Sequence, residues 1–135
     1  MKFLDPYGSP RNLKNAKKYL IDWKAKSRSK FQKDIKDFLV TYWKNDIVFE
    51  EFRVVGTMLS LDFYNANKKI AVEVQGDQHT KFVKHFHKTR LKYLDQLNRD
   101  QKKLDFCNLN DILLIEIYSS DVVDTDFFES LGVYL

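Results

Sequence analysis

Apolar residues recur at helical spacing in two long stretches of the chain. The first runs from Phe31 to Tyr42, and Ser29 followed by Gln32 forms a capping-box pattern that marks its start. The second covers residues 90–106, where leucines return every three or four positions. We therefore predict two helices here, with a short closing helix within residues 121–135.

Between and after these helices the pattern changes to that of β-strands. Residues 47–55, 59–64 and 70–75 are short runs rich in β-branched and aromatic side chains, separated by turn residues. Residues 112–117 are continuously apolar, which is typical of a strand in the interior of a sheet. The pattern predicts an α/β fold: a sandwich with a central mixed sheet flanked by helices.

The first 28 residues are predicted to form a separate basic arm. Ser9-Pro10 is a helix-start signal, and apolar residues at helical spacing up to Trp23 predict a helix with lysines on its other face. Residues 1–30 carry nine basic and two acidic side chains, a net charge of +7 in a chain of net charge +4. The division is a basic helical arm, residues 1–28, and a core domain, residues 29–135.

Composition narrows the class of protein. The 135 residues suit one domain with a full hydrophobic core, and 44% hydrophobic content argues against wholesale disorder. No apolar run is long enough to span a membrane, and no signal-peptide pattern is expected at the start. Cys107 is the only cysteine, so neither an intramolecular disulfide nor a multi-cysteine zinc site is expected. A cytoplasmic location fits these features.

Two carboxylates interrupt the apolar strands. Strict alternation places Leu61 and Phe63 on one face of their strand and Asp62 on the other. If residues 66–69 form a hairpin loop, Asp62 lies directly opposite Glu73, at about 5 Å between the backbones. Such a pair shares a proton or a divalent cation, because two close carboxylates repel each other. The alternative is the polar face of a half-exposed hairpin.

The run IAVEVQGDQH, after a hydrophobic-Asp strand and a hairpin, resembles the PD-(D/E)XK nuclease superfamily. It is most similar to the branch that contains very-short-patch repair endonucleases and phage homing endonucleases with an E-D-x-H-D pattern. The resemblance extends over roughly residues 29–118. It implies a restriction-endonuclease-like fold, with elements in the order α-α-β-β-β-α-β-α. It also implies a metal-dependent DNA endonuclease, of a phage-encoded homing or repair type.

The resemblance also implies roles for individual residues. Asp62 and Glu73 would hold Mg²⁺, with Mn²⁺ substituting for it, and the backbone carbonyl of Val74 would complete the site. Gln75 stands where the superfamily has a lysine, and it would orient the attacking water. His79 would then supply the titrating group, because a histidine exchanges protons near neutral pH.

Other residues are candidates for the same site. Gln32 takes the place of a helix glutamate of the superfamily, as a weaker neutral ligand or only as a helix cap. Glu50 and Glu51 are both able to supply the missing carboxylate, and the alternation slightly favours Glu51. Asp100 matches the last acid of the family pattern and shares a polar stripe with Lys103, although a surface stripe explains both equally well.

DNA is the expected partner, through phosphate contacts from basic residues. The candidates lie in the arm and in the loop of residues 80–89, which interleaves basic and aromatic side chains: Lys14, Lys17, Lys18, Lys81, Lys84 and His87. No membrane contact is expected, and a monomer and a homodimer are both compatible with the sequence. A non-catalytic nucleic-acid-binding module of the same fold and a small interaction protein with a basic arm are the alternative functions.

Overall fold

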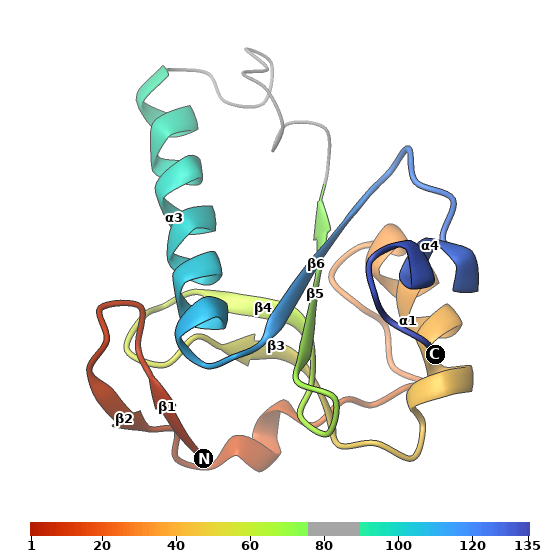
Figure 1. Ribbon diagram of the computed structural model, residues 1–135, viewed down its shortest axis with the longest axis horizontal. Helices are drawn as coiled ribbons and strands as arrows, with labels where there is room; N and C mark the ends of the chain where they lie inside the picture. Colours follow the sequence, from red (N-terminus) through yellow and green to blue (C-terminus); the bar gives the residue numbers. More distant parts are fainter. Residues whose placement is uncertain (76–89) are drawn as a thin grey trace.

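The computed structural model describes residues 1–75 and 90–135, and Figure 1 shows how their elements are arranged. The elements, in chain order, are β1 (Lys2–Leu4), β2 (Pro10–Asn12), the 3₁₀ helix η1 (Ala16–Tyr19), α1 (Lys30–Trp43), β3 (Val48–Arg53), β4 (Ser60–Asn65), β5 (Ile70–Gln75), α3 (Arg90–Leu109), β6 (Leu113–Tyr118) and α4 (Thr125–Ser130).

The central sheet has four strands in the order β3-β4-β5-β6. Neighbours β3 and β4, and β4 and β5, are antiparallel, whereas β5 and β6 run parallel. A parallel pair needs a crossover connection, and α3 lies in the connection between β5 and β6. The predicted α/β class with a mixed sheet is therefore confirmed.

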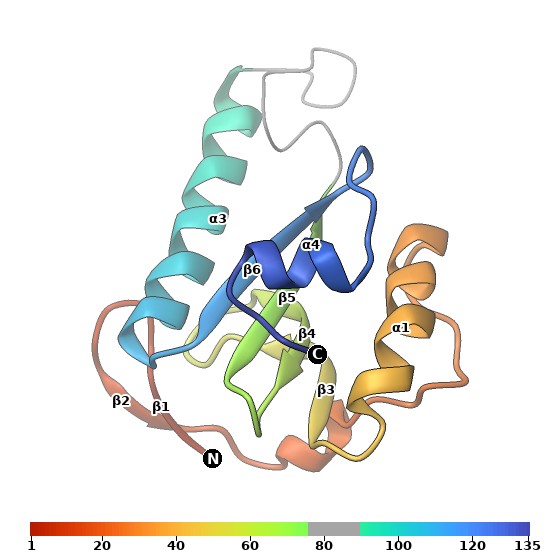
Figure 2. The same cartoon turned by 45° about the vertical axis from the view of Figure 1, so that its right-hand side comes forward.

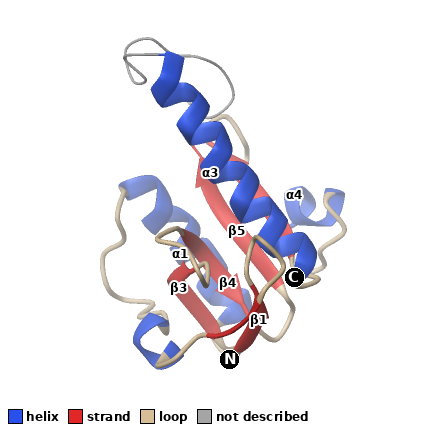
Figure 3. Cartoon of the chain, turned by 90° about the vertical axis from the view of Figure 1, so that its left-hand side faces the viewer, coloured by secondary structure: helices blue, strands red, loops and turns tan. Residues whose placement is uncertain are grey.

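Helices cover both faces of the sheet. Figure 2 shows α1 and α4 on one face, where Leu39, Trp43 and Phe128 are buried against Phe63 and Ile115. Figure 3 shows α3 running across the opposite face. Side chains of Phe106 and Cys107 from α3 are buried there in a second cluster with strand residues.

The helix predicted for residues 10–23 is wrong. This segment instead contains β2, which pairs with β1, and then the single turn of η1. Asp5 determines the hairpin, because its carboxylate accepts hydrogen bonds from the Tyr7 and Ser9 amides and from Arg11 Nε. Local side-chain hydrogen bonds of this kind offer the backbone an alternative to a helix.

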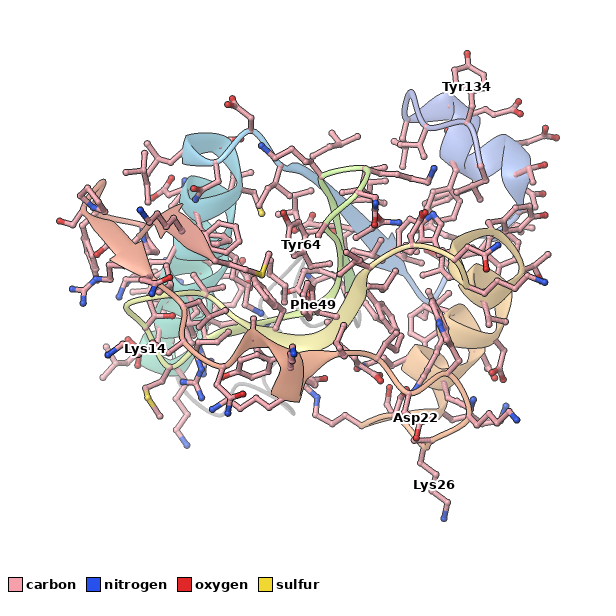
Figure 4. All side chains as sticks on the ribbon, turned by 90° about the horizontal axis from the view of Figure 1, so that it is seen from below. Lys14, Asp22, Lys26, Phe49, Tyr64 and Tyr134 are labelled. Carbon is pink, nitrogen blue, oxygen red and sulfur yellow. The ribbon has the colours of Figure 1, made fainter. Side chains whose placement is uncertain are left out.

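The same segment packs against the sheet. Leu13 is buried, and the Phe3 and Tyr19 rings lie against the same cluster, while Leu20 forms an isolated β-bridge with Phe49. Residues from the segment predicted to be a separate arm therefore share the hydrophobic core with residues beyond position 28. In Figure 4, Phe49 and Tyr64 lie within this packed interior.

The strict alternation predicted for β4 is also wrong. Leu61 packs in the cluster on the α3 side, whereas Phe63 packs in the cluster on the α1 side, although the two positions have the same parity. The alternation shifts at Asp62. At the same level of β3, between the pairs Glu50–Phe63 and Phe52–Leu61, Glu51 adopts a left-handed conformation with φ of 52°.

None of the helices among residues 1–75 and 90–135 combines the length and the apolar composition that a membrane crossing requires.

Candidate active site

A carboxylate occupies the same level of each strand in the four-stranded sheet. The register places Glu51 of β3 opposite Asp62 of β4, between the pairs Glu50–Phe63 and Phe52–Leu61. It places Asp62 opposite Glu73 of β5, one step beyond the pair Phe63–Val72, and Glu73 pairs with Glu116 of β6. We call these four residues, Glu51, Asp62, Glu73 and Glu116, the acidic row.

Asp62 and Glu73 form the buried centre of the acidic row, each with 3% of its surface exposed. The backbone pairs of β4 and β5 end at Phe63–Val72, and beyond them the two carboxylates link the strands by hydrogen bonds. Glu73 Oε2 accepts a hydrogen bond from the Asp62 amide at 2.8 Å, and Asp62 Oδ2 accepts one from the Val74 amide at 2.8 Å. The predicted placement of Asp62 opposite Glu73 is thus confirmed.

The pair is electrostatically strained. Burial, and after it the negative charge of Glu73, raises the pKa of Asp62 to about 8, against the opposing effect of the Val74 hydrogen bond. At neutral pH, the protein therefore favours a proton or another positive charge at Asp62. A divalent cation is one such charge.

Two basic side chains contact the acidic row from outside the sheet. Arg28, just before α1, places its guanidinium 3.2 Å from Asp62 Oδ1 and 3.6 Å from Glu51 Oε2. Lys103 of α3 donates from Nζ to Glu73 Oε1. Lys103 was a candidate from the sequence, but Arg28 was missed, because nothing in a basic run marks which member turns inward.

Gln32 is buried and connects α1 to β3. Its backbone amide donates to Ser29 Oγ, as the capping-box pattern predicts, but its side chain does not close the box. Instead Nε2 donates to Glu50 Oε2 and to Glu51 Oε1, both at 3.0 Å. Gln32 is therefore more than a helix cap, and it holds Glu51 next to Asp62.

Glu50 and Glu51 have separate environments. Glu50 accepts from the fully buried Lys36 at 2.8 Å and from Ser27, so its charge is neutralised by the protein itself. Glu51 is partly exposed, and Arg28 contacts both its carboxylate and that of Asp62. Of the two carboxylates, Glu51 is the one adjacent to Asp62, as the sequence slightly favoured.

The remaining predicted residues lie around the acidic row or outside the described residues. Gln75 is buried, and it lines a groove together with Asp100. Lys14, Lys17 and Lys18 are exposed near η1. Figure 4 shows Lys14 and Lys26 pointing outward from well-separated parts of the molecule, so the basic segment forms more than one patch. His79, Lys81, Lys84 and His87 lie outside the described residues.

Within residues 1–75 and 90–135, no group of three or more His, Cys, Asp and Glu side chains is arranged to hold a metal ion. Asp62 and Glu73 offer carboxylate oxygens, which are the ligands that Mg²⁺ prefers. Mg²⁺ usually needs only one or two carboxylates, because it keeps several waters. Asp62 and Glu73 therefore fit a magnesium site in which water supplies the remaining ligands.

In the comparison with known proteins, two viral proteins each match somewhat more than half of this chain. A stretch of 74 residues, 54% of this chain, is 38% identical to uncharacterized protein 307L of Invertebrate iridescent virus 6 and covers 38% of that protein. A stretch of 80 residues, 59% of this chain, is 31% identical to uncharacterized protein 033L of Invertebrate iridescent virus 3 and covers 41% of it. The chain thus spans about two fifths of these curated relatives. No family model and no solved structure matches it.

Proposed function

We propose that this chain is a Mg²⁺-dependent endonuclease that hydrolyses phosphodiester bonds in DNA. The observation that carries the proposal is the buried Asp62–Glu73 pair, held in opposite register on β4 and β5 with the pKa of Asp62 raised. A purely structural pair of buried carboxylates costs folding free energy, whereas a cation between them offsets this cost.

Magnesium would be held by Asp62 and Glu73, with the Val74 carbonyl as the third protein ligand that the resemblance implies. When bound, the ion would supply Lewis-acid stabilisation of the phosphate and a lowered pKa of water. The Arg28 side chain is 67% exposed, so it can turn away from Asp62 into solvent without disturbing the core.

The other residues of the site would handle charge and protons. Lys103 lies beside Glu73 and would provide the positive charge that Gln75, in the lysine position of the superfamily, lacks. The neutral Gln75 amide can orient a water molecule through hydrogen bonds. His79, four residues beyond Gln75 in the sequence, remains the proposed general acid or base.

The arrangement of elements supports the restriction-endonuclease-like fold within the α/β class. An antiparallel β3–β4–β5 meander follows α1, and the β5–α3–β6 crossover completes the sheet, in the order that the resemblance implies from α1 onward. DNA as the partner, a cytoplasmic location and a homing or repair role of the whole protein belong to the same proposal.

The test is digestion of supercoiled, linear, mismatched and branched DNA with Mg²⁺, Mn²⁺ or EDTA. We expect nicking that requires the metal and is abolished by Asp62→Asn, because the amide removes the central anionic ligand. Asp34→Asn is the matched control, since Asp34 is exposed on α1 and pairs with Lys30 in a surface contact.

Retention of more than a tenth of wild-type nicking by Asp62→Asn would overturn the proposal, as would cleavage in EDTA. Salt-sensitive DNA binding without any cleavage would favour the non-catalytic binding module instead.

A further inference from the structure

A groove with a volume of about 370 Å³ lies between α3 and the ends of β5 and β6. Gln75 and Tyr118, which line it, form the last register pair of the parallel strands β5 and β6. Ligands of α/β proteins commonly bind outside the carboxyl ends of parallel strands. The volume is near the lower end of ligand pockets, about 300–1,000 Å³, which suits one small planar group.

Glu116 gives this groove a pre-oriented hydrogen-bond acceptor. Its Oε2 accepts from the Tyr118 hydroxyl at 2.8 Å, and its Oε1 lies 3.4 Å from Gln75 Nε2. Burial and the hydrogen bond to Glu116 raise the pKa of Tyr118 to about 12, so the phenol stays a donor at neutral pH. Each oxygen of Glu116 keeps a lone pair for a ligand, because a carboxylate oxygen accepts two hydrogen bonds.

The walls of the groove combine acids with apolar side chains. Asp100 of α3 is a second acid in the lining, and leucines supply the apolar surface: Leu97, Leu104 and Leu114. Acidic walls repel phosphate, and apolar walls do not suit a hydrated metal ion. A nucleobase has two apolar faces and a polar edge, and it matches both kinds of wall.

We propose that this groove binds one unstacked nucleobase that carries an exocyclic amino group, next to the phosphate to be cleaved. The inference rests on the proposed nuclease function, because Glu116 is the neighbour of Glu73 in the acidic row and Gln75 belongs to both sites. Carboxylates accept hydrogen bonds from the amino groups of cytosine, adenine and guanine. Thymine has no exocyclic amino group, and its one edge donor, N3–H, is flanked by two carbonyl oxygens that the carboxylate repels, so thymine is disfavoured. The Tyr118–Glu116–Gln75 chain thus acts as a base-recognition element.

The first test uses the full chain as the Asp62→Asn variant, so that cleavage plays no part. Deoxycytidine and thymidine are titrated separately, and the backbone amide signals of Gln75 and Tyr118 are followed by NMR. We expect saturable shifts with deoxycytidine and none with thymidine. Glu116→Gln should weaken deoxycytidine binding about tenfold or more, since it replaces a charged acceptor, whereas Glu129→Gln, an exposed acid on α4, should leave it unchanged.

Equal shifts with both nucleosides, no shifts with either, or an unaffected Glu116→Gln variant would overturn the proposal.

The second test separates this proposal from the nuclease proposal. Nicks made by the wild-type chain are mapped at base resolution, and thymine should be depleted at one position beside the cut about tenfold. Nicking without any base preference overturns the base site alone. Nucleoside-selective shifts without nicking overturn the nuclease function alone.

Discussion

The guanidinium of Arg28 binds two carboxylates on adjacent strands, lying 3.2 Å from Asp62 Oδ1 and 3.6 Å from Glu51 Oε2. This contact places one positive charge beside the buried Asp62. In the proposed metal site, Arg28 and the ion would compete for Asp62 Oδ1.

Arg28→Ala should raise the affinity for Mn²⁺ about two- to fivefold, because it removes this competitor, and solvent around the 67% exposed Arg28 side chain keeps its contribution modest. Calorimetric titration measures the change, and Lys26→Ala, a nearby exposed lysine, is the control. A weaker affinity in Arg28→Ala would show that the guanidinium assists the ion rather than opposing it.

Asp62→Asn should make the metal-free protein more stable at pH 8 but not at pH 4. The folded-state pKa of Asp62 is raised to about 8, so the folded state retains a proton that the unfolded state releases near pH 4. The wild-type chain therefore loses stability as pH rises through this window, whereas the neutral amide does not. Thermal unfolding at the two pH values measures the effect, and each gain of about 1 kcal/mol raises Tm by about 3–4 °C. A stability difference that does not change with pH would contradict the raised pKa.

Gln32→Glu should destabilise the protein, more at pH 8 than at pH 5. The substitution replaces the amide that donates to both Glu50 and Glu51 with a third carboxylate at the same place. We expect a loss of about 1–3 kcal/mol from buried acceptors without donors, measured by urea unfolding. Gln101→Glu on α3 serves as the exposed control. An equal loss at both pH values would mean that shape, and not charge, is what Gln32 contributes.

Phe3→Ala should lower the free energy of unfolding by about 2 kcal/mol, somewhat less than for a fully buried phenylalanine. The Phe3 ring packs against Phe52, Tyr64 and Phe106, with ring centroids 5.4–6.2 Å apart. Tyr7→Ala, in the exposed turn of the same hairpin, should change little. Urea unfolding distinguishes them, and equal effects would place the hairpin outside the cooperative core.

His79→Ala should slow cleavage by about 10²–10⁴-fold, the usual effect of losing a general acid or base. Metal affinity should stay within about twofold, since the carboxylates are untouched. Single-turnover cleavage and calorimetry measure the two quantities. A collapse of metal binding would instead identify His79 as a ligand.

The central elements were predictable because their signals are local. The capping box at Ser29, the leucine period before Phe106 and the hairpin around residues 66–69 each depend on neighbours in the sequence. The prediction of the first helix was wrong because the Asp5 carboxylate accepts hydrogen bonds from two backbone amides of a hairpin. These hydrogen bonds outweigh a weak helical period.

The site was predictable only where one strand pair defines it. The hairpin length places Asp62 opposite Glu73, since the two residues are only 11 positions apart. Glu116 joins the acidic row through the parallel register of β5 and β6, 43 positions from Glu73 in the sequence, and Arg28 joins it from the loop before α1. Neither of these relationships leaves a periodic trace in the sequence. The left-handed Glu51 also shifts the alternation that pattern analysis assumes.

Because the Asp62 and Val74 amides donate to the two central carboxylates, the exchange of these two backbone protons depends on the state of those carboxylates. Each is donated to a carboxylate of the opposite strand rather than to a carbonyl. When Asp62 or Glu73 turns toward another positive charge, the protection of these protons changes while that of the paired strand residues persists. Hydrogen exchange at these two amides would thus report whether a cation occupies the Asp62–Glu73 pair.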